Sequence, residues 1–543
     1  IQPVAAEISK LRCFLSLVID ENIDDNAVNR GIEPLPNLEF KFVTGNTLID
    51  LEDRNLLPKQ FVFDFGETDE LQIKLQQLRN DYLQAYGEDK HKLKNDFRNT
   101  QTEIFNQEIA GGDKSQNKRA LQLASWNPFG KECSEWFNPE WMFGVEEFDI
   151  VIGNPPYVDS ENMVLTDKKN RDFYSQEYET TVGNWDLFVP FIERGIELSN
   201  ITTYIVPNKL ISQDYAETIR KMIINQNLIE IRDYSRQNVF PIADVYPITF
   251  ILQRNKVDEY NVKISKMNSL MEVNSANNIT SSLLRKYPWD IFFFGSDLSK
   301  VLIRLLNEKK KFGDLVDFLS PCTVSEAYII KDNLIDKNKD FGYKKLINSG
   351  TIDKYISKWG RKNTTYIKST YSFPCINNEH LQKISYNRFN QANQCKIIIA
   401  NMTQDLEAFI DVKSEYLAGK STVIGLGKYE DLLYVTGLIN SSLISKLYKT
   451  VNHSTKMKGG ALSVTAKRIS ELPLIENKFY SKIIIEKVIK IIDEIDNELE
   501  YLLLESQINI LVFKLYNLNY YEVKLIDPEF PLTQTEYENY IIE

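Results

Sequence analysis

The protein has 543 residues, of which 43% are hydrophobic and 26% charged, and its formal net charge is −12. These values predict three or four globular domains, and no run approaches the roughly 18 uncharged apolar residues that span a bilayer, which excludes an integral membrane protein. The five cysteines lie far apart and only 3 histidines accompany them, which excludes a disulfide scaffold and makes a metal site unexpected. The sequence starts at Ile1-Gln2-Pro3, without an initiator Met or the basic region of a signal peptide, and a reducing cytoplasm is the predicted location.

The net charge argues against a nucleic-acid binder, but the distribution of charge along the chain favours one. Residues 310–475 carry 24 Lys or Arg and 15 Asp or Glu, whereas residues 476–543 carry 6 and 14. Within 341–404 ten basic residues accompany only Asp353 and Glu379, and aromatic residues such as Trp359 lie among them. A polyanion responds to such a local field, because binding releases its counterions. An ordinary solvated lysine-rich face is the alternative.

The pattern of the first 122 residues predicts several helices and one strand. Apolar spacing predicts a helix from Pro3 to about Glu21, with Pro in its first turn. Residues 38–51 are predicted to be a strand that runs into a turn at Gly45-Asn46-Thr47. The polar stretch 69–109 predicts an inserted helical hairpin, and residues 110–122 a flexible loop.

Residues 148–253 predict a parallel α/β sheet. Phe148–Gly153 is expected to be a short buried strand, followed by a helix over 186–199, a strand over 202–206, a helix over about 212–224 and strands near 228–234 and 246–253. Short apolar strands that alternate with helices are typical of a sheet covered on both faces. Residues 310–475 lose this alternation, and the periodicity of 478–515 predicts a helical pair.

The most informative feature is Asn154-Pro155-Pro156-Tyr157, directly after the predicted strand at 148–153. Ligands of open α/β sheets bind beyond the carboxyl ends of the strands. Two prolines fix the backbone and remove its N–H donors, so the turn can only accept hydrogen bonds. An Asn side-chain oxygen beside a prolyl carbonyl can accept both hydrogens of an exocyclic amino group, which then attacks an electrophilic methyl group. The following Tyr offers a ring for a base to stack on. A proline-stiffened turn without a chemical role is the alternative.

The NPPY turn after FDIVIG resembles motif IV of the amino-methyltransferases that act on adenine N6 in DNA. Further segments are similar to other motifs of that family: 43–49 to motif III, Trp185–Phe188 to motif V, 204–210 to motif VI and 239–250 to motif VIII. Residues 310–475 resemble the family's specificity domain, with a strand at Cys395–Asn401 and a helix at Tyr434–Ser441. The order of these parts is similar to the gamma-type, type IIG restriction–modification subgroup.

The resemblance implies a role for each matching residue. Asn154, Pro155 and Pro156 would form the catalytic turn, and Tyr157 and Phe240 would stack on an adenine that is flipped out of the duplex. Asn46, Leu48 and Asp149 would border the cofactor, S-adenosylmethionine (AdoMet), although an Asp is more usual at position 46. Lys354, Lys358, Trp359, Arg361 and Lys362 would contact double-stranded DNA, with Lys446–Lys458 as a second candidate segment.

The resemblance also implies the domains and what is missing. Residues 1–265 would be a Rossmann-like methyltransferase domain with a helical insertion at 66–122, followed by a linker at 266–309, a mixed α+β target-recognition domain at 310–475 and a helical region at 476–543. The glycine-rich motif I, which cradles the methionine end of AdoMet, does not occur in the chain. We therefore expect a portion of a longer bacterial protein that by itself binds AdoMet poorly and is inactive. Any nuclease domain, with its Mg²⁺, would lie upstream.

Other functions stay open at this point. The chain could belong to a phage-defence methyltransferase without a nuclease, and upstream sequence would distinguish that case. It could be a DNA-binding module with a vestigial methyltransferase fold, or it could methylate amino nitrogens of RNA or protein. A separate specificity domain favours duplex DNA.

Overall fold

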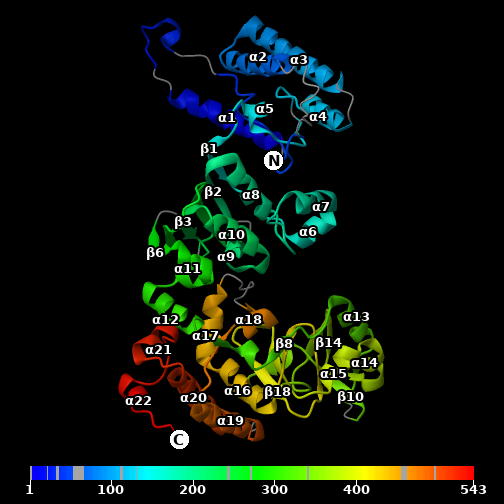
Figure 1. The fold of residues 1–543 in the computed structure, drawn as a ribbon, viewed down its shortest axis with the longest axis vertical. Helices are drawn as coiled ribbons and strands as arrows, with labels where there is room; N and C mark the ends of the chain where they lie inside the picture. The colour runs from blue at the N-terminus through cyan, green and yellow to red at the C-terminus, as the bar shows by residue number, and fades with distance from the viewer. Residues whose placement is uncertain are drawn as a thin grey trace. The chain divides into compact units, whose positions relative to one another are not determined.

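The computed structural model describes residues 3–20, 23–31, 36–52, 66–110, 114–130, 132–235, 237–240, 245–269, 272–338, 341–453, 461–494 and 497–542 (Figure 1). The chain divides into two compact units. The first comprises Ile1–Val206, Lys221–Ile229 and Thr249–Asp258, and the second comprises Pro207–Arg220, Glu230–Ile248 and Glu259–Glu543. None of the described helices combines the length and apolar character needed to cross a membrane.

The N-terminal helix α1 covers Pro3–Asp20, as predicted. The strand predicted within 38–51 is wrong, because this segment consists of turns with two isolated bridges, Gly45 to Ser134 and Asp50 to Phe137. The Asn46 side-chain oxygen accepts a hydrogen bond from the Leu48 amide at 3.1 Å. This local bond closes an Asx turn, which competes with extended pairing.

The helical insertion consists of α2 (Gly66–Leu83), α3 (Gly87–Ala110) and α4 (Lys114–Ser125). The predicted hairpin is confirmed. The predicted loop at 110–122 is wrong from Lys114 onward, since α4 packs Leu123 into a buried cluster with Leu75 and Phe97. The polar sequence of 114–122 favours a helix only weakly, and packing of its apolar residues against the rest of the insertion stabilises α4.

The central sheet has the strand order β1-β2-β4-β3-β5-β6, with β1 (Phe148–Gly153), β2 (Ser199–Pro207), β3 (Asn227–Asp233), β4 (Pro247–Gln253), β5 (Asn261–Met267) and β6 (Val273–Thr280). β1 runs parallel to β2, with Gly153 beside Tyr204, and β3 runs parallel to β5. The predicted α/β fold with parallel strands is confirmed. The helices between these strands are α8 (Phe188–Leu198) and α9, η3 and α10 over 209–224.

Burial of β1 is not as predicted. Its Ile150 and Ile152 side chains, which point to the same face of the sheet, are 53% and 80% exposed, and β1 is the edge strand of the described sheet. Residues 266–309, predicted as a linker, contain β6 antiparallel to β5, then α11 (Ser281–Lys286), η4 (Trp289–Phe293) and α12 (Ser296–Leu306). The predicted domain boundaries stay predictions.

The second unit continues with two four-stranded sheets. One has the order β18-β16-β20-β8, built from Ala408–Asp411, Lys396–Ala400, Thr422–Leu426 and Asp317–Leu319. The other has the order β19-β10-β15-β9, built from Tyr416–Ala418, Tyr343–Ile347, Pro374–Asn377 and Ile335–Asp336. A separate hairpin joins β13 (Thr364–Tyr366) to β14 (Ser369–Tyr371). The helices of this part are α13 (Val324–Asp332), α14 (Asn378–Ile384), α15 (Tyr386–Ala392), α16 (Tyr429–Asn440) and α17 (Ser442–Val451). This mixed α+β architecture agrees with the prediction.

The predicted C-terminal helical pair is confirmed as α19 (Lys478–Asp493) and α20 (Glu498–Leu515), which pack together and are followed by α21 (Tyr520–Ile526) and α22 (Gln534–Glu538). The predicted strand at 395–401 and helix at 434–441 correspond to β16 and α16.

A buried ion pair lies between β16 and β18. Lys396 Nζ is 2.5 Å from Asp411 Oδ2, and their side chains are 1% and 2% exposed. The ammonium group also donates to the Ala392 and Gln394 carbonyls, and the carboxylate accepts from the Glu415 and Tyr416 amides. Burial lowers the pKa of Lys396. All these groups are satisfied together, so the pair fixes the β18–β19 connection in one arrangement.

Removing one partner of this pair is expected to destabilise the second unit strongly. Lys396→Met keeps the volume but leaves Asp411 charged, buried and without its counterion, which typically costs about 3–5 kcal/mol. Urea denaturation measures the free energy of unfolding of Lys396→Met. The control is Lys413→Met, which removes an exposed lysine two residues beyond Asp411. Equal stability of the two variants would contradict the expectation.

Candidate functional site

The NPPY turn follows β1 without regular secondary structure. Pro155 is buried, whereas Asn154 and Pro156 are exposed. Within the described residues the Asn154 side chain makes no hydrogen bond, so its oxygen and amide are available to a ligand. The Tyr157 hydroxyl donates to the Ile205 carbonyl of β2 at 3.1 Å, and burial raises the pKa of Tyr157 to about 12. The ring of Tyr157 is therefore anchored at its hydroxyl end, and the phenol stays neutral.

Two glycines make room for one aromatic side chain beneath the turn. A Cβ atom on Gly153 would lie 2.6 Å from the Tyr204 ring, and one on Gly195 of α8 would lie 2.6 Å from the Tyr204 hydroxyl. Tyr204 is 7% exposed and packs edge-on against Phe250 of β4. Gly153 therefore allows β1 to pass close over this ring and to end where the turn begins.

The segment after the turn is fastened to the start of α8. The Leu187 amide donates to the Val158 carbonyl at 2.9 Å. Between them lie α6 (Ser160–Thr166) and α7 (Lys168–Glu177). Arg171 of α7 stacks over the buried Trp185 ring at 5.2 Å and donates to Ser160 and to the Gly183 carbonyl. The segment similar to motif V is thus held beside the NPPY turn.

The segment similar to motif III is held by α7 and α8. The Asn46 amide donates to the Tyr174 hydroxyl at 2.9 Å, and the Tyr178 hydroxyl donates to the Leu48 carbonyl at 3.0 Å. Arg194 of α8, only 9% exposed, donates to the Thr47 carbonyl and forms an ion pair with Asp50. These contacts fix a segment that has no regular strand to hold it.

The predicted cofactor residues differ in what they offer. Asn46 is part of the Asx turn and already bonds to Tyr174, and Leu48 is 2% exposed, so its side chain belongs to the core. Asp149 on β1 is exposed. Phe240, predicted to stack on the target base, lies in the second unit and is partly buried. No three His, Cys, Asp or Glu side chains of the described ranges come together as metal ligands do.

Three helix residues that position the predicted site were not found from the sequence. Tyr174, Tyr178 and Arg194 lie on the helical segments 168–177 and 188–198 or between them, more than 120 residues from the motif III segment they hold. The only sequence signal is polar residues within amphipathic helices, which does not distinguish a surface residue from a buried anchor.

Filling the space under the turn is expected to distort it. The extra methyl of Gly153→Ala must displace the Tyr204 ring or the β1 backbone, which costs about 1–3 kcal/mol. Urea denaturation is the measurement, with Gly350→Ala as control, since a Cβ there meets nothing within 4 Å. A Gly153→Ala variant as stable as Gly350→Ala would show that the packing around Tyr204 is looser than described.

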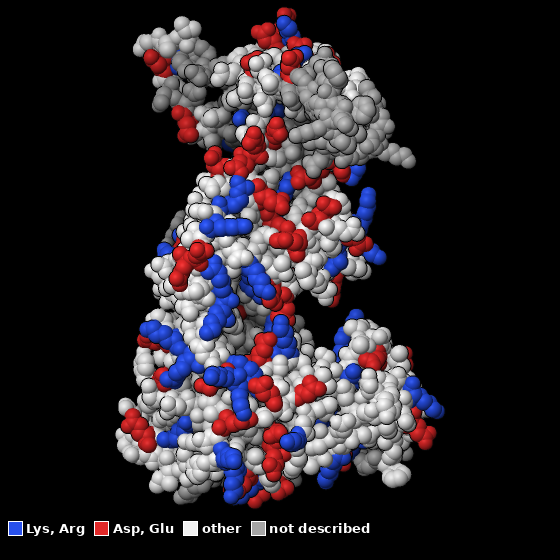
Figure 2. All heavy atoms as spheres, in the orientation of Figure 1, with Lys and Arg blue, Asp and Glu red and all other residues white. Residues whose placement is uncertain are grey.

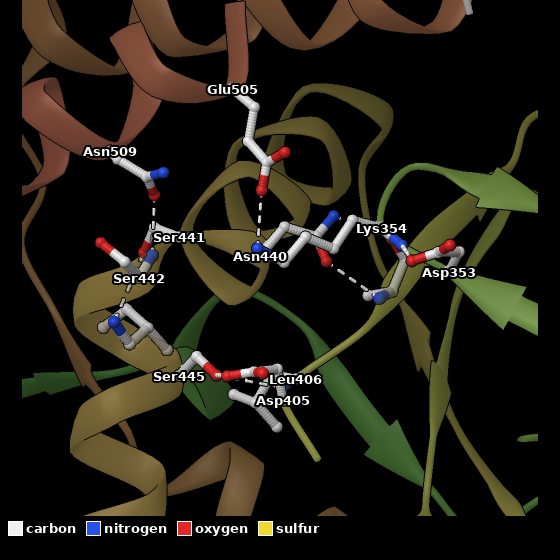
Figure 3. A network of polar contacts seen from close by, with 12 residues as sticks. Asp353, Lys354, Asp405, Leu406, Asn440, Ser441, Ser442, Ser445, Glu505 and Asn509 are labelled. Atoms are coloured by element: carbon white, nitrogen blue, oxygen red, sulfur yellow. Dashed lines mark hydrogen bonds and ion pairs between the residues drawn. The ribbon is translucent and has the colours of Figure 1, made fainter. Parts of the chain in front are cut away.

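The predicted DNA-contact residues divide into two groups. Lys354 is 2.6 Å from Glu505 of α20, and Lys358 pairs with Asp353. The Trp359 indole donates to the Pro374 carbonyl at 3.0 Å and packs against Phe373. These three side chains have intramolecular partners, and Figure 3 shows Lys354 and Glu505 within a larger polar network. Arg361 and Lys362 are exposed, and Lys362 has no ion-pair partner among the described residues.

The network in Figure 3 joins α16, α17 and α20 to the strands. Asn440 accepts from the Ala408 amide at 2.9 Å and donates to the Ala408 carbonyl at 2.8 Å. Asn509 of α20 accepts from the Ser442 amide at 2.7 Å, where α17 begins. Figure 2 shows Lys and Arg mixed with Asp and Glu over the visible face. Charge alone therefore does not mark an interface on that face.

One carboxyl group in this region titrates near neutral pH. Burial raises the pKa of Glu407 to about 7, and the Asp353 and Asp405 carboxylates contribute to the same shift. The folded state therefore binds this proton more tightly than the unfolded state, whose pKa is near 4.5. Folding stability is highest below that value and falls as the pH rises toward about 7.

Glu407→Gln is expected to remove this pH dependence. At pH 8 the variant should be more stable than the unsubstituted protein by about 1–2 kcal/mol, a value reduced for solvent screening of a partly exposed group, and at pH 4.5 the difference should nearly vanish. Urea denaturation at pH 8 and at pH 4.5 measures the difference in free energy of unfolding between the variant and the unsubstituted protein. Glu471→Gln serves as an exposed control. If Glu407→Gln were more stable than the unsubstituted protein by the same amount at both pH values, the proton-linkage explanation would be contradicted.

Comparison with known proteins finds one matching family model and several similar proteins. Residues 1–240 match the family model "Eco57I restriction-modification methylase". The chain is 28% identical over 118 residues to the type II restriction enzyme and methyltransferase RM.Eco57I of Escherichia coli. This alignment covers 21% of this chain and 12% of that protein. It is 23% identical over 612 aligned positions to the putative type II restriction enzyme and methyltransferase RM.MjaORFECS2P of Methanocaldococcus jannaschii, covering 95% of this chain and 48% of the relative.

A solved structure of the type IIL restriction-modification enzyme MmeI with DNA is similar at 12% identity and a TM-score of 0.43, over 78% of this chain and 65% of that one. The matches in sequence are thus to an Eco57I restriction-modification methylase model over residues 1–240 and to proteins named as type II restriction enzymes and methyltransferases. The chain spans half the length or less of these curated relatives.

Proposed function

We propose that this chain is the methyltransferase and DNA-recognition part of a type IIG-like restriction–modification enzyme that methylates adenine N6 in duplex DNA. The observation that supports this most directly is the exposed Asn154 side chain, which has no hydrogen bond within the described residues, on a proline-fixed turn at the carboxyl end of a parallel strand. An acceptor group left available at such a position is what recognition of an amino group requires.

In this proposal the turn acts on the amino group directly. The Asn154 oxygen and the Pro155 carbonyl accept the two N6 hydrogens, which concentrates electron density on the nitrogen. When bound, AdoMet would supply the methyl group: the S–CH3 bond would break as the N6–CH3 bond forms, S-adenosylhomocysteine would leave, and one N6 proton would pass to solvent. Pro156 keeps a competing N–H donor out of the turn. The adenine must leave the base stack to reach this site, and Tyr157 and Phe240 would stack on its two faces.

The residues of the chain fit AdoMet only in part. Asp149 offers an exposed carboxylate to the cofactor, whereas the Asn46 amide already bonds to Leu48 and Tyr174, and the Leu48 side chain is buried in the core and can only support the turn. No segment of the sequence resembles the glycine-rich motif I that would hold the methionine end. The exposed apolar residues of α1 (Val4, Ile8, Leu11) and of β1 (Ile150, Ile152) support the proposal that further polypeptide completes this site in the longer protein. The chain alone is expected to bind AdoMet weakly.

Double-stranded DNA is the proposed partner of the second unit. Arg361 and Lys362 are the contacts we favour, while Lys354, Lys358 and Trp359 would support them from within the fold. A nuclease domain with Mg²⁺ belongs to the proposal only in the longer protein. A methyltransferase without a nuclease is the nearest alternative, because the catalytic turn serves both equally.

Asn154→Ala is expected to abolish N6 methylation. The test expresses the gene with its natural upstream region in a host that lacks DNA methylation and maps N6-methyladenine by long-read sequencing. Methylation at one defined sequence should disappear in Asn154→Ala, a loss of at least a hundredfold, because one acceptor of the amino hydrogens is gone.

The exposed Asn162→Ala on α6 serves as control for folding and expression, and it should retain methylation. Methylation by Asn154→Ala at the unsubstituted level would refute the proposed role of the turn. Absence of methylated DNA in every version would favour a binding module or an RNA or protein substrate.

A further inference from the structure

The stretch 354–378 combines charge and backbone strain. It contains five basic residues and no Asp or Glu. Three of the six non-glycine residues with positive φ in the described part of the chain lie here: Tyr355, Ile367 and Lys368, at 63°, 43° and 62°. Gly360 has a φ of 73°, and a Cβ atom there would lie 2.9 Å from the Phe373 ring. Strain of this kind persists only where the surrounding structure holds it, and it concentrates at functional sites.

The strain is greatest at the tip of the β13–β14 hairpin. Tyr366 pairs with Ser369, so Ile367 and Lys368 form a two-residue connection with positive φ at both positions, the type I′ turn. This turn prefers Asn and Gly, and a β-branched Ile is among the least favourable residues for it. Ile367 packs against the buried cluster that contains Leu346 and Tyr366. Burial of the Ile367 side chain offsets the cost of its positive φ. Lys368, the second residue of the turn, is exposed to solvent.

The hairpin has an inner and an outer face. Thr364 and Tyr366 are buried, while Thr365, Lys368 and Thr370 are exposed, and Thr365 is directly opposite Thr370 in the strand register. The Asn348 side chain donates to the Thr365 carbonyl at 2.9 Å, which ties the hairpin to the fold. The outer face therefore presents two hydroxyls and an ammonium group on a rigid support, and the Lys368 side chain has no ion-pair partner among the described residues.

The loop before the hairpin adds to the same cationic surface. The amides of Arg361 and Lys362 both donate to the Lys358 carbonyl at 3.0 Å, which closes a tight turn. Asn363 accepts from the Ser372 hydroxyl at 3.3 Å, so this loop is joined to the residue that follows β14. Asp336, the nearby carboxylate, is occupied by the Ser372 and Phe373 amides. The exposed cations of 361–368 thus belong to one surface element.

We infer that the β13–β14 hairpin is the element that reads base edges in duplex DNA, with Lys368 at its tip and Thr365 and Thr370 on its outer face. The inference rests on the proposed function and goes further, because it assigns sequence readout to residues outside the predicted contact set. A two-stranded ribbon fits the major groove of B-DNA. Lys donates to guanine O6 and N7, and a Thr hydroxyl can donate to or accept from a base edge. Arg361 and Lys362 would contact phosphates and set the register.

Lys368→Asn tests this inference, because it separates folding from binding. Asn suits the left-handed position better than Lys, so the variant should be at least as stable as the unsubstituted chain in urea denaturation. Its Kd for a 30-base-pair duplex, measured by fluorescence anisotropy, should nevertheless rise tenfold or more. Lys428→Asn is the matched control: Lys428 is an exposed helix N-cap, where Asn is also favoured, and its Kd should stay within twofold.

A second arm examines base readout. Thr370→Val removes one hydroxyl at nearly constant shape. Selection from a randomised duplex library should show that this variant loses preference at one or two base positions while keeping the others. An unchanged preference, or a Lys368→Asn variant that binds like Lys428→Asn, overturns the inference and leaves DNA binding by the chain intact. Failure of the unsubstituted chain to bind any duplex would instead overturn the proposed DNA-binding function, and this inference with it.

Discussion

The buried guanidinium of Arg194 is the contact on which the predicted methyltransferase site depends. It projects from α8, donates to the Thr47 carbonyl at 3.2 Å and to Glu197 at 3.0 Å, and pairs with Asp50. Burial by itself lowers the pKa of Arg194, but these carboxylates outweigh it and the net shift is upward. The charge therefore stays in place, and a segment built only of turns is held against a helix with a fixed geometry. Asp50 and Glu197 are themselves about half exposed, so loss of Arg194 would chiefly remove the donor to the Thr47 carbonyl and the link between α8 and this segment.

The same helix also determines where the catalytic turn lies. Gly195 of α8 and Gly153 of β1 both pack against Tyr204, so helix, edge strand and central strand share one aromatic contact. Leu187, just before α8, bonds to Val158, just after the turn. The segments similar to motifs III, IV and V thus meet around α8. This arrangement holds the turn in place while the Asn154 side chain remains exposed.

In the second unit, buried polar contacts join the strands and helices in addition to its hydrophobic clusters. Lys396 and Asp411 fix two strands, Lys354 and Glu505 join a strand segment to α20, and Asn440 and Asn509 join the helices to the sheet and to each other. Basic residues that the sequence offers as DNA contacts are used for this purpose. Arg361, Lys362 and Lys368 of the strained hairpin are among the basic residues that remain exposed.

The sequence by itself predicted much of the secondary structure and singled out the NPPY turn, because these depend on local patterns. Apolar periodicity found α1, the α2–α3 hairpin, the parallel strands and the α19–α20 pair, and the NPPY spacing marked Asn154. Only the tertiary structure decided that residues 38–51 form turns and that α4 is a helix. It also decided that β1 is exposed and that Lys354 faces Glu505. Each of these outcomes depends on partners far away in the chain, such as Tyr174 for Asn46, and no local pattern encodes which polar residue will meet which.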